Sequence, residues 1–222
     1  MRTLVGNELS GGNKSDQKGF KDLTVTCLNG QLIGFVGSEA SGIDDIISIL
    51  AGHIPARKGR VLYDGSELGQ KGGEVNFALE MFSKGSIFPT VNFFERIFSS
   101  SKYTRSRADL IHRIMNEMDP DKIKKFLKSG SGPDVILHNL CHYLSFSHKA
   151  FFLNDPLISV DDDKKVKVLQ MIREMVDRFK EFILIADPNL EMLKEVCDVV
   201  YSLDDGKVIF EKSNDSEEIS VG

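Results

Sequence analysis

The 222-residue chain is long enough for one α/β domain, and its 41% hydrophobic and 27% charged residues exclude an intrinsically disordered chain. Its formal net charge of −5, without a dense cluster of Lys and Arg, argues against nucleic-acid binding. Three widely spaced cysteines match neither a disulfide framework nor a metal site, which favours a reducing, cytoplasmic compartment. No run of about 18 apolar residues occurs, so at a membrane we expect another chain to hold the protein there.

The first third of the chain predicts a strand, a glycine loop and a helix. Residues 1–19 are polar and glycine-rich, and we expect a flexible N-terminus there. The apolar run 32–36 predicts a strand, Gly37 follows it directly, and residues 44–51 carry apolar side chains at helical spacing. A second strand is expected at 60–63, before a turn.

The rest of the chain predicts a helical insertion followed by alternating strands and helices. From about 92 to 128 the apolar residues recur at helical spacing. The last third predicts strands at 150–153 and 182–186, helices at 162–181 and 190–196, and a closing hairpin of 199–203 with 208–210. This order implies a parallel-sheet core with a helical subdomain.

Five segments, in their order and spacing, resemble the ATP-binding-cassette (ABC) ATPase family from about Phe20 to Phe210. They read FKDLTVTCLNGQLIGFVGSEASG, ILAGHIPARKGRVLYDG, IFPTVNFFERI, FFLNDPLISVD and VCDVVYSLDDGKVIFE. The resemblance implies an α/β fold of the P-loop NTPase, ABC ATPase type: a RecA-like core with a parallel sheet, an N-terminal antiparallel β subdomain and a helical subdomain.

The resemblance also implies how a single ABC ATPase-like domain over 1–222 is divided. Its parts are the polar N-terminus 1–19, the β subdomain and P-loop core 20–91, the helical subdomain 92–134, the core with a Walker B-like strand and C-terminal hairpin 135–211, and an acidic tail 212–222.

The phosphate loop keeps its glycines and lacks its cation. A P-loop reads G-x-x-x-x-G-K-[ST], because backbone N–H groups curl around phosphate, Lys neutralises the β and γ phosphates, and Ser or Thr holds Mg²⁺. Here the nucleotide-binding loop reads Gly37, Ser38, Glu39, Ala40, Ser41, Gly42, Ile43 and Asp44. Ile43 stands at the Lys position and Asp44 at the Ser/Thr position, so we expect ATP with Mg²⁺ to bind weakly and no cofactor to be required. The alternative is that Asp44 ligates Mg²⁺ directly.

The other catalytic positions are altered as well. By resemblance, Asn154 and Asp155 occupy the Walker B Asp and Glu positions, Asp187 the switch His position and Glu80 the Q-loop position. Asn is a poor Mg²⁺ ligand, and Asp155 is one methylene too short for general-base chemistry. We therefore expect no catalytic residue, although a Pro-terminated strand with polar ends accounts for Asn154 and Asp155 equally well.

The signature segment and the D-loop are placed by the same resemblance. Ser131 and Gly132 match the signature, while Pro133 replaces its second glycine and removes a backbone N–H. Asp161 stands at the position of the D-loop aspartate. The earlier run Leu9-Ser10-Gly11-Gly12-Asn13 imitates the signature LSGGQ but precedes the phosphate loop, so we interpret it as a flexible polar loop.

Two further groups of residues have competing interpretations. His138 and His142 are four residues apart on a predicted helix, but no third ligand is evident, so an ordinary helix surface is favoured over a metal site. The family docks a permease helix in a groove that would here involve aromatic and aliphatic side chains; plain core packing is equally consistent. The residues of this predicted permease groove are Phe82, Ile87, Phe88, Phe93 and Phe94.

The resemblance implies a non-catalytic ABC subunit, or pseudo-ATPase, of a membrane transporter complex. Such a subunit pairs with an active ABC ATPase subunit as a heterodimer, or with itself as a homodimer, and docks an integral membrane permease. It is then cytoplasmic and peripheral on the inner face of the membrane, with no nucleic-acid partner. The alternatives are a weakly active or ATP-binding ABC ATPase that energises transport, and a soluble ABC-type regulator without a permease.

Overall fold

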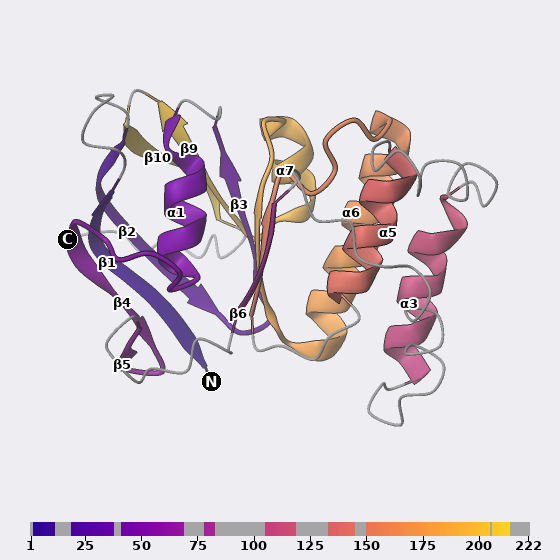
Figure 1. Cartoon of the computed structure of the whole chain (residues 1–222), viewed down its shortest axis with the longest axis horizontal. Helices are drawn as coiled ribbons and strands as arrows, with labels where there is room; N and C mark the ends of the chain where they lie inside the picture. Colours follow the sequence, from indigo (N-terminus) through magenta and orange to yellow (C-terminus); the bar gives the residue numbers. More distant parts are fainter. Residues whose placement is uncertain are drawn as a thin grey trace.

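The computed structural model describes residues 2–11, 19–37, 41–68, 78–82, 105–118, 133–144, 150–204 and 206–213. Its strands form two sheets, and helices flank the larger one (Figure 1).

The smaller sheet is an antiparallel β subdomain. It contains β1 (Thr3–Gly11), β2 (Phe20–Leu28), β4 (Lys58–Tyr63) and β5 (Ser66–Glu67), in the order β2-β1-β4-β5. Alternating buried and exposed residues along β2 give this sheet one face for the core and one for solvent.

Strand β1 corrects the expectation of a flexible polar terminus. Leu4 and Leu9 are fully buried in the core, and β1 pairs with both β2 and β4. A Cβ at Gly11 would approach Ile49 Cδ1 to 2.6 Å, so this glycine allows the strand to pack closely on a helix. The first part of the LSGG run, through Gly11, is therefore a packed strand instead of a loop; Gly12 and Asn13 lie outside the described residues.

The larger sheet is the core of the molecule. Its strands are β3 (Leu32–Val36), β6 (Ala78–Phe82), β7 (Ala150–Asn154), β8 (Phe182–Ala186), β9 (Val199–Asp204) and β10 (Lys207–Ser213), in the order β10-β9-β3-β8-β7-β6. Neighbouring strands are parallel except β10, which is antiparallel to β9. All residues of β7 and β8 are buried, as expected for parallel strands covered on both faces.

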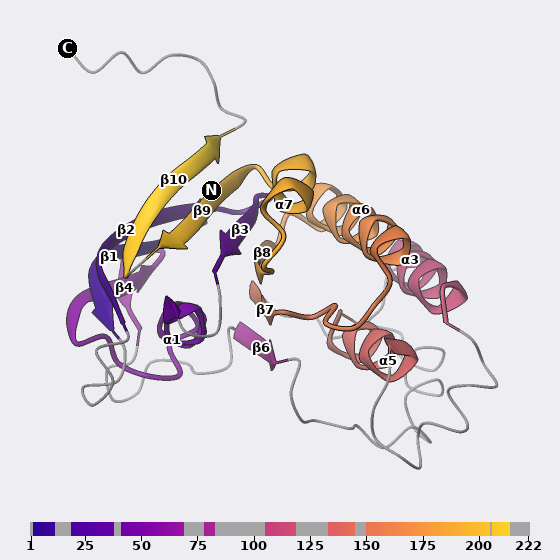
Figure 2. The same ribbon diagram turned by 90° about the horizontal axis from the view of Figure 1, so that it is seen from above.

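Helices divide between the two faces of this sheet. They are α1 (Ile43–Leu50), α3 (Arg105–Asn116), α5 (Pro133–Leu144), α6 (Asp162–Phe179) and α7 (Leu190–Val196). Figure 2 shows α1 enclosed between the two sheets, while α3, α5, α6 and α7 lie on the opposite face. The core correspondingly forms two clusters, one on each face of the large sheet. This layering confirms the predicted ABC-type P-loop fold with its antiparallel subdomain.

Several elements begin and end at the predicted residues, while others, such as α1, β4 and α6, are displaced by one or two residues at an end. The strands 32–36 and 182–186 and the helix 190–196 begin and end where the apolar runs predict. Helix α5, in contrast, crosses the expected boundary between residues 134 and 135. Within the described parts of the chain, no helix is long and apolar enough to cross a membrane.

Candidate functional site

The carboxyl ends of β3, β7 and β8 bring the predicted nucleotide-site residues to one edge of the large sheet. In parallel α/β sheets this edge is where ligands bind. Gly37 follows β3, Asn154 is the last residue of β7, and Asp187 follows β8. These three positions are widely separated in sequence, and the parallel strand order places them together.

The phosphate loop still needs its glycines. Gly42 has φ 87° and precedes the first residue of α1, in the left-handed region that favours glycine. A Cβ at Gly37 would approach the Ser41 hydroxyl to 2.5 Å, so a side chain there would displace Ser41. Ser38, Glu39 and Ala40 lie outside the described residues. Each described end of the loop therefore has a position that glycine fits and a larger residue would strain or displace.

The Lys position of the loop is filled by a buried apolar side chain. Ile43 is only 4% exposed and belongs to the core cluster between the two sheets, together with Ile46 and Ile47. Asp44 and Asp45 follow it in the first turn of α1. Carboxylates suit the positive end of a helix dipole, so both are stable in this turn.

Asp44 and Asn154 contact each other directly. The Asn154 amide Nδ2 donates a hydrogen bond of 2.7 Å to Asp44 Oδ1. Asn154 is 6% exposed, and β8 lies between its strand and β3, from which α1 departs. The bond therefore ties the first turn of α1 to the carboxyl end of β7. We call these two residues the Asp44–Asn154 pair.

Asp187 is turned into the protein. It is 2% exposed, its N–H donates to the Phe35 carbonyl at 3.1 Å, and its Oδ1 accepts from the Asn189 N–H at 2.8 Å. The Asn189 side chain in turn accepts from the Met192 N–H at 3.1 Å and caps α7. Burial raises the pKa of the Asp187 carboxyl, and its Oδ2 has no hydrogen-bond partner among the described residues. This side chain stabilises the turn into α7.

Other predicted site residues occupy a range of positions. Asp155 has a left-handed φ of 45°, and its N–H donates to the Ala186 carbonyl at 2.8 Å. Asp161 is exposed at the N-cap of α6, and Pro133 begins α5, while Ser131 and Gly132 lie outside the described residues. Glu80 pairs with Phe152 inside β6, two residues before the strand ends.

Most residues of the predicted permease groove lie outside the described residues, whereas the His138 side chain can be placed. Ile87, Phe88, Phe93 and Phe94 lie outside the described residues, as does the Phe82 side chain, although its backbone ends β6. His138 is on α5 but only 1% exposed, which corrects the expectation of an ordinary helix surface; burial lowers its pKa. Among described residues, no group of three His, Cys, Asp or Glu could hold a metal ion.

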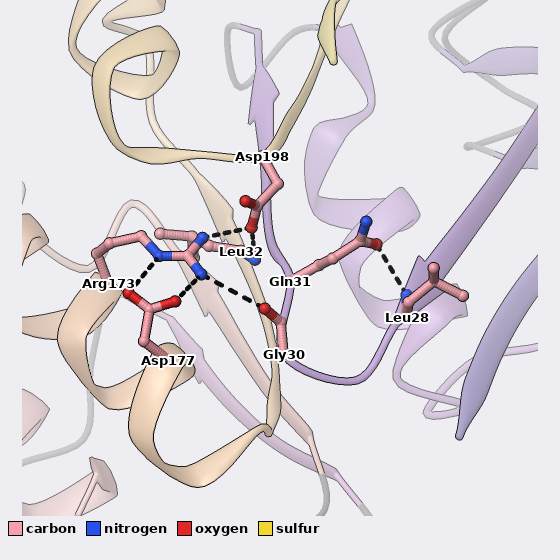
Figure 3. Close-up of polar contacts among 7 residues, drawn as sticks. All are labelled: Leu28, Gly30, Gln31, Leu32, Arg173, Asp177 and Asp198. Atoms are coloured by element: carbon pink, nitrogen blue, oxygen red, sulfur yellow. Dashed lines mark hydrogen bonds and ion pairs between the residues drawn. The ribbon is translucent and has the colours of Figure 1, made fainter. Parts of the chain in front are cut away.

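The opposite, amino end of the large sheet contains paired charges that the sequence analysis missed. Arg173 of α6 bonds Asp177 and Asp198 and donates to the Gly30 carbonyl at 3.4 Å, and Asp198 Oδ2 accepts from the Leu32 N–H at 2.8 Å (Figure 3). We call this the Arg173 clamp, because it joins α6 to the beginnings of β3 and β9. The i,i+4 spacing of Arg173 and Asp177 could have signalled that pair, whereas no local sequence pattern signals the bonds to Asp198 and Gly30.

A second cation near the same end is buried. Arg107 of α3 is 5% exposed, pairs with Glu181 and donates to the Leu144 carbonyl at 2.9 Å. Its guanidinium lies 4.5 Å from the centre of the Phe179 ring. This group therefore fixes α3 both to α5 and to the residue preceding β8.

Comparison with known proteins finds distant relatives along most of the chain. No family model matches the chain. The thiamine import ATP-binding protein ThiQ of Jannaschia sp. (strain CCS1) is 21% identical over 192 residues, which cover 84% of each chain. The petrobactin import ATP-binding protein YclP of Bacillus subtilis (strain 168) is 22% identical over 212 residues, 90% of this chain and 84% of that protein.

Solved structures share this fold. A dimeric ATP-binding cassette in a post-hydrolysis state, bound to ADP and Pi, has a TM-score of 0.72 at 14% identity and covers 94% of this chain and 98% of its own. A bacterial Atm1-family ABC exporter with ATP bound has a TM-score of 0.72 at 14% identity, over 95% of this chain and 38% of that one. The chain thus has the ABC ATPase fold. Both relatives are named as import ATP-binding proteins, and both structures are described as ATP-binding cassettes or ABC exporters.

Proposed function

We propose that this chain is a non-catalytic, ABC-type subunit of a membrane transporter complex. The observation that carries the proposal is the buried apolar side chain of Ile43 where a P-loop requires a cation. Phosphoryl transfer depends almost entirely on positioning and on charge stabilisation, so a site without this cation lacks a principal catalytic component.

The residues at the site do not fit tightly bound Mg-ATP. A charge-assisted hydrogen bond contributes about 1.5–3 kcal/mol, so losing the Lys contact alone weakens phosphate binding roughly 10- to 150-fold. Asp44 and Asp45 add negative charge to the first turn of α1, which opposes a triphosphate. Asn154 offers its amide N–H₂ to Asp44, and an N–H donor is not a metal ligand.

The proposed role is assembly. The chain would pair with a competent ABC ATPase, or with itself, and dock an integral membrane permease at the inner face of the membrane. The names of its relatives support this, because several are ATP-binding proteins of import systems or transporters. In this proposal, Asp161 of the D-loop and Pro133 of the signature segment lie near the interface with the second ABC subunit.

A weakly active ATPase is the second candidate, and one observation favours it. In a P-loop NTPase, the loop Ser/Thr and the Walker B Asp together supply one carboxylate, on the strand. The Asp44–Asn154 pair also supplies one carboxylate, but on the helix. In addition, the relatives are named as ATP-binding proteins. In this version Asp44 would ligate the metal.

Calorimetric titration with Mg-ATP separates the two candidates. We expect no saturable heat in the micromolar range for the wild-type chain, and binding in a triple variant Ile43→Lys/Asp44→Ser/Asn154→Asp, which restores cation, hydroxyl and metal ligand. The matched control carries Ile43→Leu with the same two other changes and should stay weak. Micromolar binding and turnover by the wild-type chain would favour the active ATPase.

Co-purification tests the assembly role. Tagged chain isolated from detergent-solubilised membranes should bring down a permease and a second ABC subunit. Recovery of the chain alone, or with partners that include no integral membrane protein, would instead support an ABC-type regulator without a permease.

A further inference from the structure

The Asp44–Asn154 pair joins two elements that are distant in sequence and separated by a strand. Asp44 belongs to the first turn of α1 and Asn154 ends β7, with β8 between β7 and β3. Their 2.7 Å bond crosses 110 positions of sequence. It is therefore a tertiary contact at the point where helix, phosphate loop and central strands meet.

These two positions are the ones that a P-loop NTPase uses for its metal. There, Mg²⁺ is held by the loop Ser/Thr and by a Walker B Asp. Here the carboxylate has moved from the strand to the helix, and the strand carries an amide instead. The exchange leaves the carboxylate count of the two positions unchanged and supplies a donor, so the two side chains can bond without an ion.

The orientation of the amide argues against a metal between them. A metal could use only the oxygen of the Asn154 side chain, whereas its Nδ2 is the atom directed at Asp44. Binding an ion would require the amide to turn over and the hydrogen bond to break. Asn154 is buried whereas Asp44 is partly exposed, so the bond is shielded from competing water on the Asn154 side.

We propose that the Asp44–Asn154 pair is a metal-independent latch that holds the phosphate-loop helix to the central sheet. The inference rests on the proposed function in one respect, the assignment of these residues to the two metal positions. The helix is then held in place with no ion or nucleotide, which suits a subunit whose task is assembly.

Thermal unfolding with and without metal tests the latch, with MgCl₂ or EDTA at matched ionic strength and no nucleotide. The wild-type Tm should be the same in both, within about 1 °C. Asn154→Asp places two carboxylates at this contact, so its Tm should fall by on the order of 5 °C in EDTA and recover largely in MgCl₂. Asn154→Leu can neither donate nor ligate and should lose a similar amount in both solutions.

Asp45→Asn is a control that changes the charge of the first turn of α1 without touching the pair; its Tm should not depend on Mg²⁺. If the wild-type Tm rises with MgCl₂ alone, or if Asn154→Leu is as stable as the wild type, the latch is wrong. Should Asn154→Asp not fold in EDTA, refolding on addition of MgCl₂ supports the latch, and failure in both solutions contradicts it. Nucleotide plays no part, so ATP binding by the wild-type chain could defeat the proposed function and leave this result intact.

Discussion

The two ends of the large sheet treat charge in opposite ways. At the amino end, Arg173 and Arg107 each pair with carboxylates and with a backbone carbonyl, and they join helices to strands. At the carboxyl end, among described residues, Asp44, Asp45 and Asp187 lie around the predicted phosphate loop, and the apolar Ile43 stands at its proposed Lys position. The charges that stabilise the fold are thus separate from the positions that would bind a ligand. These fold-stabilising pairs therefore do not depend on the residue types at the predicted nucleotide site.

The largest expected effect is at the buried cation of the amino end. Arg107→Leu leaves Glu181 without its ion-pair partner in the core, and such a loss typically costs about 3–5 kcal/mol. The free energy of unfolding in urea measures it. The double variant Arg107→Leu/Glu181→Leu should recover much of the loss, because no buried charge then lacks a partner. A small loss in the single variant would remove the contrast between the two ends.

The Arg173 clamp should contribute less, because its guanidinium is partly solvated. Arg173→Ala removes bonds to Asp177, Asp198 and Gly30, for an expected loss of about 1–3 kcal/mol in urea unfolding. Arg178→Ala is the matched control, since Arg178 pairs with Glu174 at the surface, and it should cost less than about 1 kcal/mol. Equal losses would mean that the clamp adds nothing to an ordinary surface pair.

The smallest effect is a pH dependence of opposite sign at the two ends. The hydrogen bond from Arg173 lowers the pKa of Asp177 below its ordinary 3.8, so its contribution is present above that value and is lost as pH falls through the lowered pKa. Burial raises the pKa of Asp187 above 3.8, so stability is lost as pH rises through the raised pKa.

Unfolding of two Asn variants from pH 3 to 7 measures these slopes against the wild type. The penalty of Asp177→Asn should shrink towards pH 3, whereas Asp187→Asn should gain stability relative to wild type as pH rises above about 4. Slopes of the same sign would show that burial does not dominate at Asp187.

Much of the fold follows from local pattern. The apolar runs of β3 and β8 and the helical spacing of α6 predict their elements, because burial on a sheet or helix face imposes a short period on the sequence. Strand β1 escaped prediction because its glycines and polar residues imitate a loop. Its pairing with β4 comes from a segment about 50 positions away, which no local window contains.

The candidate site divides in the same manner. The sequence by itself determined which residue types stand at the predicted phosphate loop and Walker B positions, including the apolar Ile43, because identity and spacing are properties of the chain. Only the tertiary structure decided that Ile43 and Asp187 are buried and that Asp44 bonds Asn154. Those facts depend on which strands become neighbours, and hydrogen bonds between distant residues leave no periodic trace in the sequence.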